Sequence, residues 1–403
     1  MPILFSLTII VVLCIVAWLV FCALIAWNGL SLLSLKDIEI APLKAKPLLT
    51  VIIPACNEAT TIENALQSLR QSDYPNLEIL LVNDRSTDET GAIIDRMAVQ
   101  DKRIRPIHIT TLPEGWLGKV HALYTASKEA SGDFLLFTDA DVHFQSDTLS
   151  RTLAYMEASN LDHLTMLPET RAVTAPSVFS QAAVSLTIAG FAALFLYGLR
   201  LRKVRQPDST AFVGVGAFNM VRRSTFAKTK GWEWLKMDVI DDVGLGKMMK
   251  ESGAHCDALN GVGCIHLEWY PSVKALAQGF EKNFFAGIGR YRWSVLLWRI
   301  TQLAAVVFLP YFAAALALVF GGGASLLLAV FCALNLLPLL FALPFRRKMP
   351  VSPYLLGFLP IAFLTVIAIM LRSAWIVTRN GGISWRGTFY PLETLRREQR
   401  VQL

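Results

Sequence analysis

The sequence has few cysteines and no cysteine pair at metal-binding spacing. Six cysteines occur among 403 residues, and none forms a Cys-x-x-Cys pair. Three of them, Cys14, Cys22 and Cys332, lie in long apolar runs. Disulfide frameworks and structural zinc sites both need a more regular cysteine spacing. The sequence therefore indicates neither, and its thiols fit a reducing, cytosolic setting.

Acidic residues are also fewer than basic residues. The formal net charge is +7, from 38 Lys and Arg against 31 Asp and Glu. The basic residues flank apolar runs, as Lys36, Lys44, Arg346 and Arg347 do. This placement matches the positive-inside rule and attraction to anionic lipid headgroups. We therefore expect a lipid bilayer as a partner and no nucleic acid.

Long apolar runs are the most prominent feature of the sequence. Hydrophobic residues make up 54% of the chain, and the mean hydropathy is +0.46. Residues 3–35 exceed the roughly 20 residues that cross a bilayer. Three more apolar runs follow: 295–320, 324–343 and 351–377. We expect a multi-pass protein of the inner (plasma) membrane, with a retained N-terminal transmembrane anchor over 1–36 and a C-terminal transmembrane region over 294–378.

Three other segments are less regular. Residues 178–199 are apolar, but a span there would place Asp139 and Asp242 on opposite sides of the membrane, so we expect this segment at the interface or packed on the domain. Residues 272–293 are predicted as an interfacial amphipathic helix, with a plain core helix as the alternative. Residues 379–403 form a basic C-terminal tail. One span before the domain and three after it would put this tail outside, whereas its arginines favour the inside, so the number of spans stays open.

Strand and helix patterns alternate between residues 48 and 141. Expected strands are Leu48–Pro54, Leu77–Asp84, Ile104–Ile109 and Phe134–Asp141; expected helices are Glu58–Arg70, Thr87–Val99 and Lys119–Ala130. Such alternation predicts an α/β fold with a mainly parallel sheet and flanking helices. We place this domain at 37–271. Ligands of such sheets bind outside the carboxyl ends of the strands, where Glu58, Asp84 and Asp139 are expected to converge.

The most informative pattern is Asp139-Ala140-Asp141, which follows the apolar run Phe134–Phe137. Two carboxylates at the end of a buried strand can hold Mg²⁺ or Mn²⁺, which typically bind one or two carboxylates plus substrate phosphates. A lone Asp-x-Asp is more often a polar exit from a strand. The surrounding motifs favour the metal site.

Those motifs resemble membrane-associated family 2 glycosyltransferases of the GT-A fold, whose catalytic domain is Rossmann-like. The motifs are Pro54-Ala55-Cys56-Asn57-Glu58, Val82-Asn83-Asp84-Arg85-Ser86-Thr87-Asp88, Gly118-Lys119, Asp139-Ala140-Asp141, Gly216-Ala217-Phe218-Asn219 and Asp241-Asp242. The match runs from about 48 to 293. Gly115–Lys119 and Trp385-Arg386-Gly387 look closer to the hopanoid-biosynthesis-associated and carotenoid glycosyltransferases.

The resemblance implies a role for each motif. Glu58 and Asp84 would contact the base and ribose of a nucleotide-sugar donor, and Lys119 would lie near its phosphates. Asp139 would contribute to donor binding and, with Asp141, hold Mg²⁺ or Mn²⁺ against the diphosphate. Surface acids and a solvated lysine are the plainer alternatives.

The acid pair would supply the base. Asp242, beside Asp241, would deprotonate the acceptor, because a neighbouring carboxylate raises a carboxyl pKa. The family carries Glu-Asp where this chain has Asp241-Asp242, and simple helix capping is the alternative. Gly216 and Ala217 would form an acceptor-side turn.

The expected reaction is an inverting, metal-dependent sugar transfer to a hydroxyl of a membrane lipid, hopanoid-, carotenoid- or ceramide-like, with the catalytic domain cytoplasmic. Polymer-forming relatives carry Gln/Arg-x-x-Arg-Trp where this chain has Gly289-Arg290-Tyr291-Arg292-Trp293. Arg292 and Trp293 fit as acceptor-side residues, but Gly289 departs from the pattern. The rivals are a processive polysaccharide synthase and a non-catalytic membrane protein with a decayed transferase domain.

Overall fold

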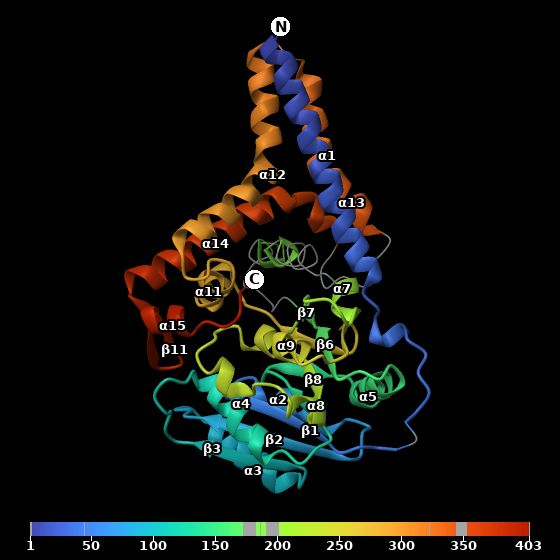
Figure 1. Cartoon of the computed structure of the whole chain (residues 1–403), viewed down its shortest axis with the longest axis vertical. Helices are drawn as coiled ribbons and strands as arrows, with labels where there is room; N and C mark the ends of the chain where they lie inside the picture. The colour runs from blue at the N-terminus through green and yellow to red at the C-terminus, as the bar shows by residue number, and fades with distance from the viewer. Residues whose placement is uncertain are drawn as a thin grey trace. The chain divides into compact units, whose positions relative to one another are not determined.

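A computed structural model describes residues 2–43, 45–171, 183–185, 187–190, 201–321, 323–343 and 353–402. The chain divides into two compact units. The sheet unit comprises Leu32–Arg171, Arg200–Glu268 and Gly381–Leu403; the helical unit comprises Met1–Ser31, Ala172–Leu199 and Trp269–Asn380. Figure 1 traces their elements. The segment predicted at 178–199 lies largely outside the described residues.

The sheet unit is built on a seven-stranded sheet with the order β3-β2-β1-β4-β8-β6-β9. Its strands are β1 Leu49–Ala55, β2 Leu77–Asp84, β3 Ile104–Ile109, β4 Phe134–Phe137, β6 His163–Leu167, β8 Asn219–Arg222 and β9 Cys256–Asn260. β1 pairs in parallel with β2 and β4, and β2 with β3, whereas β8 runs antiparallel to β4 and β6. The predicted α/β fold with a mainly parallel sheet is confirmed.

Burial on both faces explains the continuous apolar runs of the central strands. Ile53, Leu81 and Leu136 are at most 2% exposed and belong to one core. On helix α2 (Ile62–Arg70), the buried residues recur every three or four positions, as an amphipathic helix requires. The other helices of this unit are α3 Thr90–Gln100, α4 Gly118–Glu129, α5 Thr148–Ala158, α7 Leu201–Arg205, α8 Arg223–Phe226, α9 Asp241–Glu251 and α15 Leu392–Glu398.

Two predicted boundaries were wrong by four residues. The strand expected over Phe134–Asp141 ends at Phe137, and a short loop leads to β5 (Val142–Phe144), which belongs to a second, three-stranded sheet with β7 (Glu169–Arg171) and β10 (Ile265–Glu268). In this loop the Thr138 hydroxyl donates to the carbonyl of Ala217 at 2.7 Å, while the Thr138 backbone N–H donates to the Ile52 carbonyl of β1. The helix expected from Glu58 begins at Ile62, after a left-handed residue at Asn57.

The helical unit contains apolar helices. Among the described residues, four stretches are long and apolar enough to cross a membrane: Pro2–Ser31, Trp293–Val319, Ala324–Phe341 and Tyr354–Arg379. They correspond to helices α1 Pro2–Ser31, α12 Trp293–Val319, α13 Ala324–Ala342 and the pair η4 Pro353–Phe358 and α14 Leu359–Arg379. Trp18 and Phe363 pack edge to face inside this unit.

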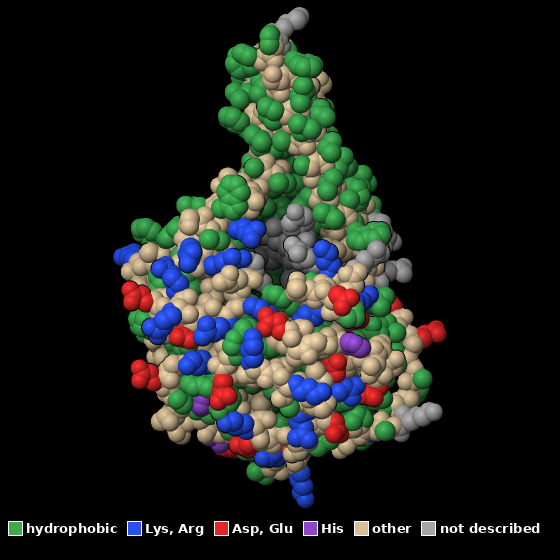
Figure 2. All heavy atoms as spheres, in the orientation of Figure 1, with side chains coloured by type: hydrophobic (Ala, Val, Ile, Leu, Met, Phe, Trp, Pro, Cys, Tyr) green, Lys and Arg blue, Asp and Glu red, His purple; other side chains and the backbone are tan. Residues whose placement is uncertain are grey.

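The outer surface of these helices is hydrophobic. Trp298 and Phe312 are each 63% exposed, and Figure 2 shows hydrophobic side chains covering the part formed by α1, α12 and α13. Charged side chains are spread over the sheet unit in the same view. Such an apolar exterior is typical of helices surrounded by lipid, because exposing an apolar surface of this extent to water costs free energy. The chain is therefore a membrane protein.

The segments around the last helices also differ from prediction. Residues 272–293 do not form one helix but two short ones, α10 (Val273–Gly279) and α11 (Asn283–Gly287). Each ends at a glycine, which weakens a helix. Arg290 and Tyr291, which follow α11, adopt positive φ. Residues 379–403 are not a separate basic tail. From Gly381 they belong to the sheet unit, as the hairpin β11 (Gly382–Trp385) and β12 (Thr388–Pro391) followed by α15.

Candidate active site

The predicted lysine lies between two of the predicted acids. Lys119, at the start of α4, places its Nζ 2.7 Å from Asp139 Oδ1 and 3.5 Å from Asp241 Oδ2. Asp139 lies in the loop after β4, whereas Asp241 is the first residue of α9. The fold thus joins three elements distant in sequence around one ammonium group.

Asp242 lies at the same place and is held by backbone amides. Its Oδ2 accepts a hydrogen bond from the Gly216 N–H at 2.8 Å, and its Oδ1 accepts one from its neighbour Val243 at 2.8 Å. Both acids of the pair lie in the first turn of α9, where unpaired backbone N–H groups favour negative charge. Helix-start chemistry and site geometry therefore coincide here.

Gly216 lies against two of the acids. A Cβ at this position would lie 2.7 Å from Asp139 Oδ2 and 3.5 Å from Asp242 Oδ2. The first distance is shorter than real Cβ contacts show, so only glycine fits without moving Asp139. The next residue, Ala217, is 3% exposed and contributes its carbonyl to Thr138.

The electrostatics of this cluster are strongly perturbed. Burial, and then the charge of Asp241, raise the pKa of Asp242 to about 6. Burial, followed by Asp139 and Glu58, raises the pKa of Asp141 to about 7. For Lys119, burial opposes the charge, but Asp139, Asp241 and Asp242 outweigh it and raise the pKa. Several carboxylates thus share one lysine, so the cluster has unbalanced negative charge.

The carboxylates fit a divalent cation only with help from a ligand. In the part of the chain that the structure describes, no group of three or more His, Cys, Asp or Glu side chains is placed to hold a metal. Asp139 and Asp141 supply two carboxylates, and burial, followed by the charges of Asp139 and Glu58, raises the pKa of Asp141. Mg²⁺ and Mn²⁺ commonly bind one or two carboxylates plus phosphate oxygens. The donor set fits such an ion.

Glu58 and Asp84 form a second group, together with two arginines of the motifs to which the sequence analysis assigned no role at the site. Arg85 forms two hydrogen bonds to Asp84, from Nε at 2.7 Å and Nη2 at 3.0 Å. Arg386, at the tip of the β11–β12 hairpin, donates to the Glu58 carboxylate and to the Cys56 carbonyl. The charge of Glu58 also raises the pKa of Asp141, which links the two groups.

The hairpin makes two further contacts in this group. Thr388 accepts a hydrogen bond from Arg85 Nη1 at 2.9 Å, and the Tyr390 hydroxyl accepts one from the Gly118 N–H at 3.2 Å. The only sequence signal for this hairpin was Arg386-Gly387, a dipeptide whose glycine favours a tight turn. Nothing in the local pattern could indicate that this hairpin contacts Arg85, about 300 residues earlier in the chain.

Strained backbone marks the same group. Asn57, Arg85 and Arg386 have φ values of 56°, 55° and 50°, in the left-handed region that glycine favours. Each such residue costs of order 1–3 kcal/mol and persists only where its surroundings hold it, commonly at ligand sites. Three from separate segments meeting at one place is therefore a mark of a binding site.

Two predicted residues lie in the helical unit. Trp293 begins α12, and its indole N–H donates to Thr378 Oγ1 of α14 at 3.0 Å. Arg292 precedes it as the helix cap residue. Their acceptor-side role stays a prediction.

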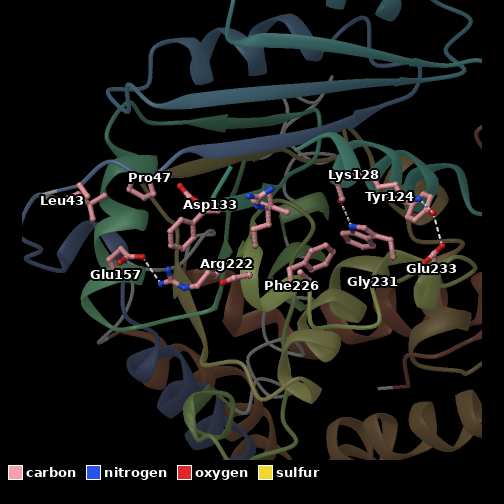
Figure 3. Close-up of a pocket in the computed structure, with 18 residues that line it drawn as sticks. Leu43, Pro47, Tyr124, Lys128, Asp133, Glu157, Arg222, Phe226, Gly231 and Glu233 are labelled. Atoms are coloured by element: carbon pink, nitrogen blue, oxygen red, sulfur yellow. Dashed lines mark hydrogen bonds and ion pairs between the residues drawn. The ribbon is translucent and has the colours of Figure 1, made fainter. Parts of the chain in front are cut away.

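A larger cavity lies elsewhere in the sheet unit. It has a volume of about 1010 Å³ and is lined by residues that include Asp133, Glu157, Arg222 and Phe226, as Figure 3 shows. Phe134 and Arg222 face each other in the β4–β8 register, so this cavity lies at the start of β4, whereas the acids follow its end. A separate, small cavity is lined by Lys119, Asp139, Gly216, Asp241 and Asp242.

Comparisons with known proteins find glycosyltransferases among the proteins similar to this chain. The model of glycosyl transferase family 2 matches residues 50–229. An uncharacterized glycosyltransferase of Bacillus subtilis, EpsJ, is 34% identical over 116 residues, 29% of this chain and 32% of that protein. A 4,4'-diaponeurosporenoate glycosyltransferase of Staphylococcus aureus is 23% identical over 283 residues, 66% of this chain and 71% of that protein. The chain thus spans about a third of the length of the first relative.

A solved structure shares the fold. A mannosyltransferase of Pyrobaculum calidifontis, in complex with GDP-Man and Mn²⁺, is 20% identical, with a TM-score of 0.50 over 91% of this chain and 99% of that one. This similarity supports the GT-A fold.

Proposed function

We propose that this chain, which matches the model of glycosyl transferase family 2 over residues 50–229, is a membrane-associated glycosyltransferase that transfers a sugar from a nucleotide-sugar donor to a hydroxyl of a membrane lipid, with inversion. One observation carries the proposal: Lys119 lies within 2.7 Å of Asp139 and 3.5 Å of Asp241, while Asp242 lies beside them on Gly216. Acids that the sequence spreads over a hundred residues share one small cavity.

The donor would bind across both groups of acids. Glu58 and Asp84 would accept hydrogen bonds from the base and ribose of a nucleoside diphosphate, for which a uridine donor is our first choice. Lys119 would lie near the diphosphate and balance its charge. A bound dianion would add negative charge beside several carboxylates that already share this one lysine, so donor binding would also require a cation.

Asp141, with Asp139, would hold Mg²⁺ or Mn²⁺ together with the donor phosphates. When bound, such an ion acts as a Lewis acid and makes the nucleoside diphosphate a better leaving group. The mannosyltransferase of Pyrobaculum calidifontis, solved with Mn²⁺ and GDP-Man, supports testing these ions and a guanosine donor too.

Asp242 would act as the general base. Burial and Asp241 raise its pKa to about 6, which leaves it ionised near neutral pH yet basic enough to take a proton from a hydroxyl. The hydroxyl oxygen would attack the anomeric carbon as the bond to the diphosphate breaks, and the proton would pass to Asp242. One displacement inverts the anomeric configuration. Gly216 and Ala217 would line the acceptor side, with Arg292 and Trp293 as candidate acceptor contacts.

A lipid acceptor is supported by the apolar helices and by the carotenoid glycosyltransferase relative. A hopanoid-, carotenoid- or ceramide-like lipid would fit, and the sheet unit would face the cytoplasm, where nucleotide sugars are made. The glycine at position 289 argues against polymer synthesis. A Cβ there would lie 2.9 Å from the Phe285 carbonyl oxygen and 2.8 Å from its ring, so the Gln or Arg of polymer-forming relatives would not fit.

The test is to incubate the purified full chain with Mn²⁺, labelled UDP- and GDP-sugars, and total membrane lipid, and to identify labelled lipid by mass spectrometry. A singly glycosylated lipid is expected. Long water-soluble polymer would favour the processive synthase. If no donor is consumed and an Asp242→Asn variant still complements a deletion strain, the chain is a membrane protein with a decayed transferase domain.

A further inference from the structure

The C-terminal segment from Gly381 contacts the candidate site at several motifs. Its hairpin bonds Glu58 through Arg386 and the Gly118 N–H through Tyr390, as described above. Beyond the hairpin, α15 buries Leu395 completely, and Val401 is also 0% exposed. The family match ends at residue 229, so it assigns this segment no role. Figure 1 labels α15 and α9, the elements concerned.

The end of the segment is held by Asp238, which is 1% exposed. Asp238 Oδ2 accepts hydrogen bonds from the backbone N–H groups of Arg400 and Val401, both at 2.8 Å. Its Oδ1 accepts one from Ile240 at 3.3 Å, the residue before α9. A buried carboxylate is costly unless its oxygens are satisfied. Here backbone donors from two segments, rather than a cationic side chain, satisfy them.

We call the hydrogen bonds from Arg400 and Val401 to Asp238 the C-terminal latch. Two further contacts extend this latch along α9. Lys247 Nζ donates to the Arg400 carbonyl at 2.8 Å. A Cβ on Gly244 would lie 3.1 Å from Val401 Cγ2, so the valine packs directly on the first turns of α9. The loop before α9 is tied on its other side as well, because the Leu117 N–H donates to the Lys236 carbonyl at 2.7 Å, next to Gly118 and Lys119.

We propose that Asp238 is a positioning residue, which uses the C-terminal segment to fix the start of α9 and so holds Asp241 and Asp242 in place for sugar transfer. This inference rests on the proposed function. Asp238 is three residues from Asp241 and itself points to Arg400 and Val401, so it does not touch the reacting atoms. Its effect passes through the Ile240 amide and the Lys247 contact to the acid pair, where small displacements are expensive.

The first test compares Asp238→Asn with Asp257→Asn in the purified full chain. Asp257 is a matched control: it is 4% exposed and bonded to Tyr155 and Arg205, but it lies on β9. Both variants should lower the melting temperature. Only Asp238→Asn should lower kcat, by about ten- to a hundredfold, while the donor KM changes less than about twofold. Equal kcat values in the two variants would overturn the proposal.

Two further variants apply if Asp238→Asn does not fold. Lys247→Met removes the bond to Arg400 and should lower kcat by about two- to fivefold, whereas Lys247→Arg should restore it. A chain ending at Gln399 lacks both latch amides, and a chain ending at Gln402 keeps them; only the first should lose turnover. Wild-type rates in Lys247→Met and in the chain ending at Gln399 would refute the latch.

Hydrogen exchange separates this inference from the proposed function, because it needs no substrate. In the chain ending at Gln399, amides of residues 239–246 should exchange about tenfold faster than in the chain ending at Gln402, while β2 stays unchanged. Unchanged exchange at 239–246 would overturn the latch even if sugar transfer is established. Faster exchange would support it even if wild-type protein proves inactive toward the donors tried.

Discussion

Replacing Gly216 with alanine tests the geometry of the acid cluster. The new Cβ would lie 2.7 Å from Asp139 Oδ2, and ordinary contact starts at 3.4 Å. The carboxylate must therefore retreat by about 0.7 Å, which stretches its 2.7 Å contact with Lys119. Asp139 is the end of a flexible side chain, so the fold should tolerate the change, and we expect a loss of stability of no more than about 1 kcal/mol.

Activity should respond far more strongly than stability. A displacement approaching 1 Å at a reacting centre can cost about a hundredfold in rate, so Gly216→Ala should lower kcat by about ten- to a hundredfold. The assay is release of nucleoside diphosphate from a labelled donor with Mn²⁺ and lipid, alongside thermal unfolding.

Gly91→Ala is the matched control. A Cβ on Gly91, in α3, would also lie 2.7 Å from the end of a polar side chain, Nδ2 of Asn83. Asn83 and Asp84 are consecutive on β2, so their side chains point to opposite faces of the sheet. Gly91→Ala should therefore keep kcat within about twofold. If Gly216→Ala also stays within that range, the acids do not act where the structure brings them together.

Three other predictions follow from the same geometry. Asp242 must be ionised to accept a proton, and its pKa is raised to about 6, so kcat/KM should fall as the pH drops through about 6. Asp241→Asn should move this acidic limb of the pH profile to lower pH. If the limb does not move, it belongs to the titration of another group. Chelation with EDTA should abolish sugar transfer, and added Mn²⁺ should restore it. Asp141→Asn should raise the Mn²⁺ concentration needed for half-maximal activity by about tenfold or more. If wild type and Asp141→Asn need the same Mn²⁺ concentration, Asp141 is not a metal ligand. Gly289→Gln should lower the melting temperature of the full chain without producing polymer, because Phe285 occupies the space; long-chain product from this variant would contradict that reading.

Much of the sheet unit could be predicted because its strands are buried on both faces. Ile104–Ile109 and Leu77–Asp84 were predicted with the bounds that the structure shows. The strand ending at Phe137 was predicted four residues too long: the chain enters a loop after Phe137, in which the Thr138 hydroxyl donates to the Ala217 carbonyl. Local periodicity carries no information about such a partner.

The acid cluster was predictable in its members but not in its contacts. Each acid follows a strand or starts a helix, which local pattern can indicate. The bridging position of Lys119 and the close approach at Gly216 depend on the packing of α4 against α9 and the loop after β4. The role of the C-terminal segment was missed for the same reason: its basic composition suggested a tail, whereas its contacts with Glu58 and Asp238 join positions far apart in the chain.

The most direct measurement compares wild-type protein with Asp242→Asn in Mn²⁺, labelled nucleotide sugar and membrane lipid, with nucleoside diphosphate binding measured on both. The account predicts equal nucleotide binding, labelled β-linked lipid from the wild type, and at least about a thousandfold less from the variant. Undiminished lipid labelling by Asp242→Asn, or a product that retains the donor's anomeric configuration, would contradict it.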